Sequence, residues 1–210
     1  MSVSLRFNGG RRIEIRPSRL LPPSSALTRA AEEQALRRLT PTLLNHSYRV
    51  FAFGAAIGEV ERITVDREVL LAAALLHNVG LPTPIRNTDF TVTSARIARD
   101  VAEEVGLSSA ATHTLRTAIT LHHSPGVTRA DGPVAYLLAA GAAVDVVGFR
   151  SWQLPNDVLA AVVVQHPRLL FKGEYAELCR IEAERVPKGR MEFLRRYGLA
   201  FAIRHAPFRD

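Results

Sequence analysis

The sequence has a single cysteine, Cys179, among its 210 residues. It therefore cannot form an internal disulfide, and it has no cluster of thiolates to bind a metal. Any metal in this protein has to be held by other side chains, chiefly histidine and carboxylate. The sequence also has no run of about 18 apolar residues, the length that a membrane-spanning helix needs, and its N-terminus has no apolar signal-peptide segment. We expect a cytoplasmic protein with no membrane partner.

Lysine is almost absent as well. Only Lys172 and Lys188 are lysines among the 27 basic residues, which exceed the 20 acidic residues and give a net charge of +7. The excess lies in the first 50 residues, where nine arginines face three glutamates. A basic patch is typical of nucleic-acid binding, but an arginine bias also follows from genomic composition. We do not expect nucleic acid to be the partner.

The chain divides into a short arm and one helical domain. Residues 1–23 contain alternating apolar residues on both sides of an Asn-Gly-Gly turn, then a linker with Pro22 and Pro23. This pattern predicts a β-hairpin or an extended arm, whose strand edges also offer a contact for a homo-oligomer. Residues 24–210 show helical periodicity almost throughout, and 47% of the chain is hydrophobic. We therefore predict an all-α bundle carrying a small N-terminal appendage.

Capping residues and prolines give the expected helix boundaries. Ser25, Thr40 and Asp66 are predicted N-caps, and Pro41 and Pro133 are predicted first helical residues. The predicted helices cover residues 26–39, 41–62, 67–80, 93 or 94 to 105, 109–122, 133–147, 155–165, 172–186 and 188–204.

Asp145 is the only charged residue between Pro133 and Phe149. An unpaired carboxylate in such apolar surroundings is very costly, so Asp145 needs a cation, a hydrogen-bonding cluster or a raised pKa. The structural alternative is an aspartate paired with an arginine. Small residues before it, from Ala139 to Ala143, predict that a neighbouring helix packs closely against this one.

Two histidines also follow or interrupt apolar helical segments. His46 shares a helix face with Val50, Phe53 and Ile57, and His77 follows an apolar run that begins at Val69. One buried histidine is usually a hydrogen-bonded core residue. Two histidines and an aspartate on three helices instead indicate a divalent-metal site, for which imidazole and carboxylate suit Zn, Fe, Mn or Ni.

A further pair, His122 and His123, ends the helix that precedes Ser124. Adjacent helical residues diverge by roughly 100°, so only one of the two is expected to face a common site. The candidate roles are metal ligand, proton-transfer group, or a histidine that stabilises the helix C-terminus. His113 lies about 180° from His122 around the helix and is not expected to share that site.

These segments resemble the HD-domain superfamily, and within it the cyanamide-hydratase-like branch. The resemblance rests on "NHSYRVFAFG", "AAALLHNVGL", "AITLHHSPG" and "AYLLAAGAAVDVVGFR", with "HPRLLFKGEY" further on. It implies an all-α HD-domain bundle in which a His, an adjacent His-Asp pair and a late Asp bind a divalent metal that activates water or substrate. On this resemblance His46, His77 and Asp145 are metal ligands.

The chain departs from the family at one ligand. Asn78 stands where the HD pattern has its aspartate. An amide has one acceptor oxygen and no charge, so the affinity for a divalent ion should fall, and a bridged two-metal centre is not expected. With one negative charge fewer, a retained metal would be the stronger Lewis acid.

Three interpretations follow, and the sequence leaves them open. The first is a metal-dependent hydrolase or hydratase-like lyase, acting on a small compact substrate such as a nitrile, in which Asn78 orients water or substrate and His122 or His123 moves protons. The second is an HD fold without metal or catalysis that binds a small molecule or a partner. The third is metal-free acid and base catalysis.

The substrate is only weakly indicated. Arg49 and Arg150 follow His46 and Asp145 closely in the sequence and are candidates for binding an anionic group. Phosphate-ester hydrolysis, which is common elsewhere in the superfamily, is therefore the competing chemistry.

Overall fold

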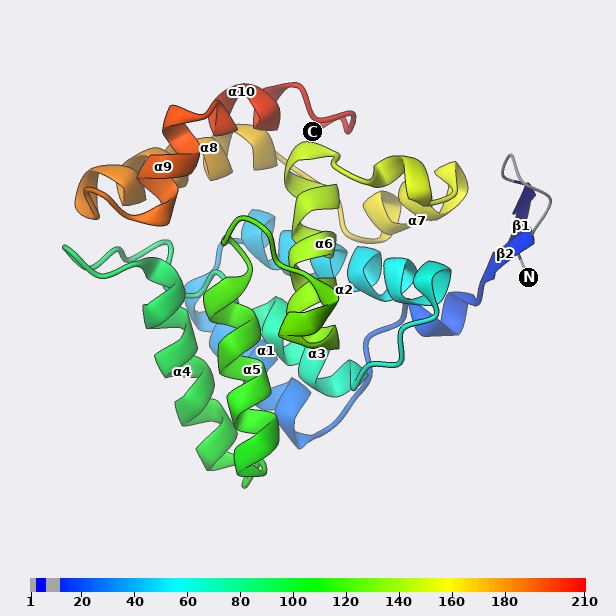
Figure 1. Ribbon diagram of the computed structural model, residues 1–210, viewed down its shortest axis with the longest axis horizontal. Coiled ribbons are helices and arrows are strands. Elements are labelled where there is room, and N and C mark those ends of the chain that lie inside the picture. The colour runs from blue at the N-terminus through cyan, green and yellow to red at the C-terminus, as the bar shows by residue number, and fades with distance from the viewer. Residues whose placement is uncertain (1–2, 7–11) are drawn as a thin grey trace.

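The computed structural model describes residues 3–6 and 12–210, and nearly all of its regular secondary structure is helical (Figure 1). The predicted all-α fold is confirmed. At the N-terminus, β1 (Val3–Arg6) pairs antiparallel with β2 (Arg12–Ile15), with Val3 opposite Ile15. The predicted Asn-Gly-Gly turn lies outside the described residues. Ile15, the last residue of β2, is buried against the helices.

The helices follow the caps and prolines that the sequence supplies. Ser25 forms a capping box with Thr28, and Thr40 and Asp66 accept backbone N–H donors at the starts of their helices. The ten α-helices of the described residues are α1 (Ala26–Arg38), α2 (Pro41–Glu61), α3 (Arg67–Leu76), α4 (Phe90–Glu104), α5 (Ser109–Leu121), α6 (Pro133–Val147), α7 (Asn156–Gln165), α8 (Phe171–Arg185), α9 (Arg190–Arg196) and α10 (Leu199–Arg204).

Three predicted boundaries were wrong. Helix α4 starts at Phe90 because the Asp89 carboxylate caps it, several residues before Thr93. Helix α3 ends at Leu76, so His77 and Asn78 lie in the turn that follows it. The last predicted helix is in fact two helices, since Gly198, with φ of 89°, interrupts the helical conformation between α9 and α10.

Helices α2 and α6 cross at the centre of the molecule (Figure 1). Glycines allow this close approach: a Cβ on Gly141 would overlap the Val50 carbonyl oxygen and lie 2.9 Å from the Gly54 nitrogen. The close packing predicted from the small residues of α6 is confirmed. Because α2 carries His46 and α6 carries Asp145, this crossing brings two of the candidate site residues together.

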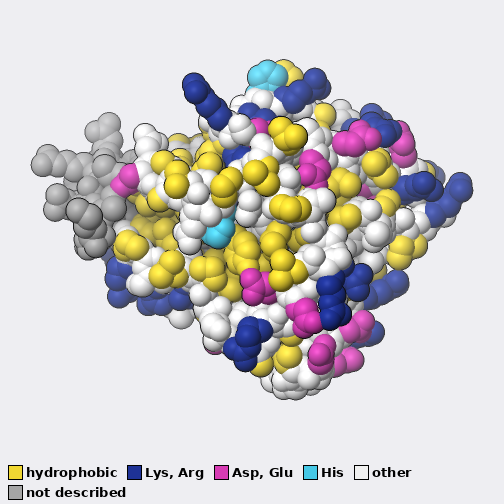
Figure 2. All heavy atoms as spheres, turned by 180° about the vertical axis from the view of Figure 1, so that it is seen from behind, with side chains coloured by type: hydrophobic (Ala, Val, Ile, Leu, Met, Phe, Trp, Pro, Cys, Tyr) yellow, Lys and Arg dark blue, Asp and Glu magenta, His cyan; other side chains and the backbone are white. Residues whose placement is uncertain are grey.

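The other helices surround this pair. Helices α4 and α5 run side by side, and α8, α9 and α10 pack on one another, with α10 reaching one end of α6 (Figure 1). On the opposite face of the molecule, hydrophobic side chains form a broad patch, and charged side chains lie mainly toward its edges (Figure 2). No helix of residues 3–6 and 12–210 combines the length and apolarity needed to cross a bilayer.

Candidate active site

Asp145 lies at the centre of a buried polar cluster between α2, α6 and the segment before α8. Its Oδ1 accepts from Arg49 Nε at 2.8 Å and from Arg168 Nη1 at 2.7 Å. Its Oδ2 accepts from Arg49 Nη2 at 2.9 Å and lies 2.6 Å from His46 Nδ1. The carboxylate, both arginines and His46 are fully buried. The hydrogen-bonding cluster that the isolated charge of α6 required is therefore present.

The charges in this cluster decide its protonation state. Burial by itself would raise the pKa of Asp145, but the Arg49 guanidinium and the His46 hydrogen bond outweigh it and lower that pKa. Burial also lowers the pKa of His46, against the opposing effect of Asp145. Arg168 Nε lies 3.1 Å from Asp210 Oδ1, so two arginines face two carboxylates. Asp145 is therefore ionised, and His46 is neutral at pH 7.

The orientation of His46 follows from its partner. An ionised carboxylate only accepts, so Nδ1 of His46 carries the proton and Nε2 carries a lone pair. His77 is arranged in the same way, with Nδ1 2.6 Å from the Ala74 carbonyl oxygen, and burial holds its pKa well below the ordinary value. The two Nε2 atoms lie 3.3 Å apart. Two buried acceptors thus face each other with no hydrogen between them.

This geometry suits a cation. Two nitrogens, each about 2.0–2.1 Å from a tetrahedral Zn²⁺, are on the order of 3.3 Å apart. The partners of the two Nδ1 atoms are a carboxylate and a carbonyl, which fix the tautomer of metal-binding histidines in many proteins. The imidazole pair therefore fits a divalent ion in its spacing, its protonation and its supporting hydrogen bonds.

Further buried atoms that could bind a metal, and that have no hydrogen-bond partner, lie beside this pair. The Asn78 amide oxygen and nitrogen are both buried and make no hydrogen bond in the described structure. His122 donates from Nδ1 to the Ile119 carbonyl oxygen at 2.6 Å, and its buried Nε2 has no partner. The His122 ring meets His77 edge-on, with centroids 4.9 Å apart. Asn78 and His122 are therefore the groups available to complete a ligand set.

Within the described residues, no three His, Cys, Asp or Glu side chains form a ready-made metal cluster. The reason is that the His46 ring lies between Asp145, on its Nδ1 side, and the Nε2 of His77, on its Nε2 side. In this arrangement Asp145 supports His46 from behind and does not share the space between the two histidines. Asn78, as an amide, supplies no carboxylate to replace it.

His123 also borders the site, against the expectation that only one of the pair would. It lies beyond the last residue of α5, so the helical angle between neighbours does not constrain it. Its Nε2 is 3.0 Å from the Tyr175 hydroxyl, and burial lowers the pKa of His123 to about 4. The Tyr175 ring packs 5.5 Å from that of His46. His113, which was not expected to share the site, is exposed on α5.

The two arginine candidates have different positions. Arg49 is in the site, but Nε and Nη2 bind Asp145 and Nη1 donates to the His166 and Pro167 carbonyls, so the anion that it holds belongs to the protein. Arg150 was a candidate for the site because it follows Asp145 closely in the sequence. It pairs instead with Glu61, which lies 15 residues from His46, on the order of 22 Å along α2.

Sequence reasoning missed Arg168, Phe171 and Tyr175 as parts of the site. Phe171 stacks on His46 with ring centroids 4.7 Å apart, and Arg168 lies over the Phe171 ring. The four-residue spacing of the two aromatics on α8 is a recognisable signal of one buried helix face. No local signal marks Arg168, because its burial depends on Asp145, 23 residues earlier.

Comparison with known proteins agrees with this arrangement. The chain matches the HD domain family over residues 43–165, which include His46, His77, Asn78 and Asp145. It is also similar to two cyanamide hydratases of Saccharomyces cerevisiae, DDI2 and DDI3. Each is 28% identical to it over 176 residues, covering 80% of this chain and 77% of the relative. The resemblance to the cyanamide-hydratase-like branch is thereby confirmed. With more than half of its length matched, the chain belongs to the HD-domain family.

Proposed function

We propose that the protein is a metal-dependent hydratase or hydrolase that acts on a small compact substrate at the His46–His77 pair. The observation that carries the proposal is the pair of buried Nε2 atoms, 3.3 Å apart, with both Nδ1 protons directed elsewhere. His46 and His77 would hold a divalent ion, Asn78 Oδ1 or His122 Nε2 would complete its ligands, and such an ion acidifies bound water and polarises the substrate.

The residues around the pair have separate tasks under this proposal. Asp145 fixes the tautomer and the direction of His46, and Arg49 and Arg168 keep Asp145 ionised. Asn78 presents a carbonyl oxygen and an NH2 group that no protein atom occupies, so it can orient water or substrate. Phe171 closes the site beside His46 and excludes water.

Tyr175 and His123 are the proton-transfer pair. Burial raises the pKa of Tyr175 well above its usual value, and the nearby Asn78 amide opposes this only slightly without forming a hydrogen bond of ordinary geometry. His123 is neutral, so its Nε2 can accept a hydrogen bond from the Tyr175 hydroxyl across 3.0 Å. Hydration of a carbon–nitrogen multiple bond adds water across it, so that carbon gains the hydroxyl and nitrogen gains a proton. Tyr175 Oη would donate the proton to nitrogen, and the proton lost by the attacking water would return to Tyr175 Oη through His123 Nε2.

The substrate class is inferred from the relatives and from the burial of the site. The two yeast relatives are cyanamide hydratases. His46, His77 and Asn78 have no exposed surface, so a substrate has to be small or has to enter through a local opening. The cavities with defined linings lie elsewhere on the molecule. A nitrile or a similar compact nitrogen compound satisfies both conditions.

The test is the metal content of protein purified without chelator, measured by elemental analysis and paired with a cyanamide hydration assay. We expect about one divalent ion per chain in the native protein and in His113→Ala, an exposed control on α5. His46→Ala should lose both the metal and the activity, and metal should raise the melting temperature of the native chain and of His113→Ala but not that of His46→Ala. Native protein that binds no metal from Zn, Fe, Mn or Ni solutions would contradict the proposal.

A second candidate, an HD fold that binds ligands without catalysis, is favoured by two observations. Asn78 replaces the carboxylate of the HD pair, and the four hydrogen bonds of the Asp145 carboxylate go to protein partners. This candidate predicts that only Asn78→Asp gains stoichiometric metal. The same metal measurement on that variant separates the two functions.

A further inference from the structure

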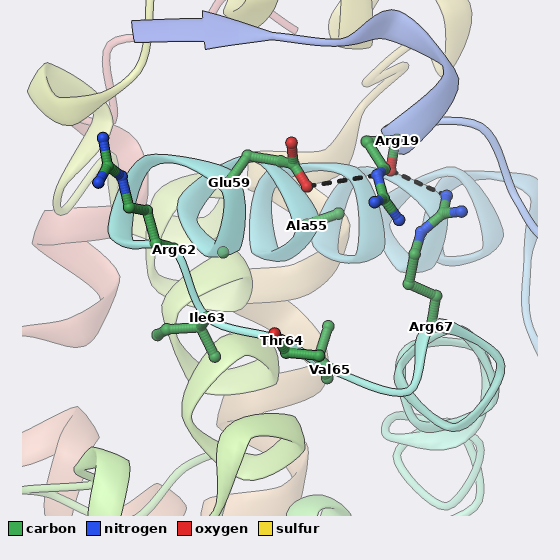
Figure 3. Close-up of a pocket in the computed structure, with 9 residues that line it drawn as sticks. Arg19, Ala55, Glu59, Arg62, Ile63, Thr64, Val65 and Arg67 are labelled. Carbon is green, nitrogen blue, oxygen red and sulfur yellow. Dashed lines mark hydrogen bonds and ion pairs between the residues drawn. The ribbon is translucent and has the colours of Figure 1, made fainter.

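A pocket lies on the side of α2 away from the histidine cluster, where the N-terminal segment meets the α2–α3 loop. Its volume is about 300 Å³, and Figure 3 shows its lining side chains. They come from η1 (Pro17–Arg19), from the last two turns of α2 and from residues 62–67. None of these residues takes part in the histidine cluster.

The lining is strongly basic. Three arginines and one glutamate line the pocket, leaving a net charge of +2: Arg19, Arg62, Arg67 and Glu59. Arg19 Nε lies 3.5 Å from Glu59 Oε1, which offsets one of the positive charges. Arg62 has no ion-pair partner among the described residues. A pocket of this size and charge suits a small anion.

Arg67 has a hydrogen-bond donor for which the described residues supply no acceptor. Its Nη2 donates to the Arg19 and Leu21 carbonyl oxygens at 2.9 and 2.6 Å, which ties the N-terminal segment to the first residue of α3. Its Nε is buried and has no hydrogen-bond partner in the described structure. A buried donor without an acceptor is costly, so an anion beside the Arg67 guanidinium would be stabilising.

Two like charges meet at this end of the pocket. Arg19 and Arg67 lie next to each other, with Glu59 reaching toward Arg19 along α2 (Figure 3). Burial and the positive charge of Arg19 lower the pKa of Arg67, against the effect of Glu59. An oxyanion between the two guanidiniums would relieve their repulsion and accept the hydrogen bonds that they still offer.

We propose that this pocket binds a carboxylate or phosphate group of a small metabolite on Arg19 and Arg67. Ile63 and Val65 line the loop side of the pocket and can contact the apolar part of such a ligand.

The proposal is tested by titrating the full chain with inorganic phosphate and, separately, with acetate, at ionic strength held constant with chloride. Amide chemical shifts of residues 62–67 report the binding. We expect saturable shifts there, about fivefold weaker binding in Arg19→Ala, and unchanged binding in Arg116→Ala, an exposed arginine on α5. The tighter of the two probes identifies the class of anion.

A variant that strengthens binding guards against simple misfolding. Glu59→Gln removes the competing carboxylate and should bind the anion several-fold more tightly. Glu103→Gln, which removes an exposed charge on α4, is its matched control and should bind as the native chain does. Non-saturable shifts, wild-type affinity in Arg19→Ala, or no gain in Glu59→Gln would each overturn the proposal.

Discussion

Asp145 is the residue on which the central cluster depends. Its carboxylate is the shared partner of Arg49, Arg168 and His46, all of which are buried. Removing one member of a buried ion pair leaves the other charges uncompensated, which costs far more than the loss of a surface pair. The apolar sequence of α6 is therefore compatible with a charge only because two other segments, α2 and the residues before α8, supply its partners.

We predict that Asp145→Asn lowers the free energy of unfolding by about 3–5 kcal/mol, because the buried Arg49 guanidinium loses its counter-ion and Arg168 keeps only Asp210. Urea unfolding at pH 7 measures the effect. Asp100→Asn, which removes an exposed carboxylate paired with Arg99, should unfold with the native midpoint. Equal stability of the two variants would show that the cluster is not a buried ion network.

Asn78 illustrates how a single residue can separate two functions. Its side chain is fully buried, yet neither amide atom has a partner. A buried amide serving only as core is expected to be hydrogen-bonded. The vacant hydrogen-bonding capacity therefore points to a bound ion, water or substrate at this position.

At the scale of elements, the contact between α2 and α6 positions the site. Gly141 has the Val50 carbonyl and the Gly54 nitrogen directly against it, so the two backbones touch where a side chain would otherwise lie. This contact sets the distance between His46 and Asp145. The same helix pair carries Arg49, so three members of the cluster depend on it.

We predict that Gly141→Ala lowers the free energy of unfolding by roughly 1–3 kcal/mol, because the added methyl group forces the helices apart. Gly173→Ala is the matched control, since nothing lies within 4 Å of a Cβ on Gly173 in α8. That substitution should stabilise the protein by about 0.5–1 kcal/mol. Calorimetric melting of both variants measures the difference, and a stabilised Gly141→Ala would disprove the close packing.

At the scale of the whole molecule, stability should depend on pH through a buried carboxylate that is not part of the Asp145 cluster. Glu182 on α8 is 1% exposed, and its Oε1 accepts from the Phe90 N–H at the start of α4. Burial raises its pKa to about 7, and Asp89 adds to this effect. The folded protein therefore binds the Glu182 proton more tightly than the unfolded chain does.

The sign of the effect follows by linkage. The contribution of Glu182 is fully present below its unfolded pKa, near 4.5, and is lost as the pH rises toward 7. On acidification, buried neutral histidines change the stability in the opposite direction. Comparison with a Glu182 variant is therefore needed to isolate the effect of Glu182. We predict that, between pH 7 and pH 5, the native chain gains stability relative to Glu182→Gln. Urea unfolding of both proteins at these pH values, with a chelator present to remove metal, measures the effect. A stability difference between them that does not change with pH would contradict the prediction.

The sequence by itself determined the helices and the identity of the candidate ligands. Ser25, Thr40, Asp66 and Pro133 set helix starts where predicted, because caps and prolines act on the backbone within a few residues. The isolated charge of Asp145 also required a partner wherever the chain folded. These conclusions depend on local interactions and on burial, which the sequence encodes directly.

Only the tertiary structure decided which atoms face one another. Arg168 lies 23 residues from Asp145, and Tyr175 lies 52 residues from His123, so their contacts depend on how distant helices pack. The structure also separates Arg150 from the site and directs the His46 and His77 Nε2 atoms toward each other. Side-chain direction, tautomer and charge pairing come from contacts across the fold, and no periodicity or spacing along the chain specifies them.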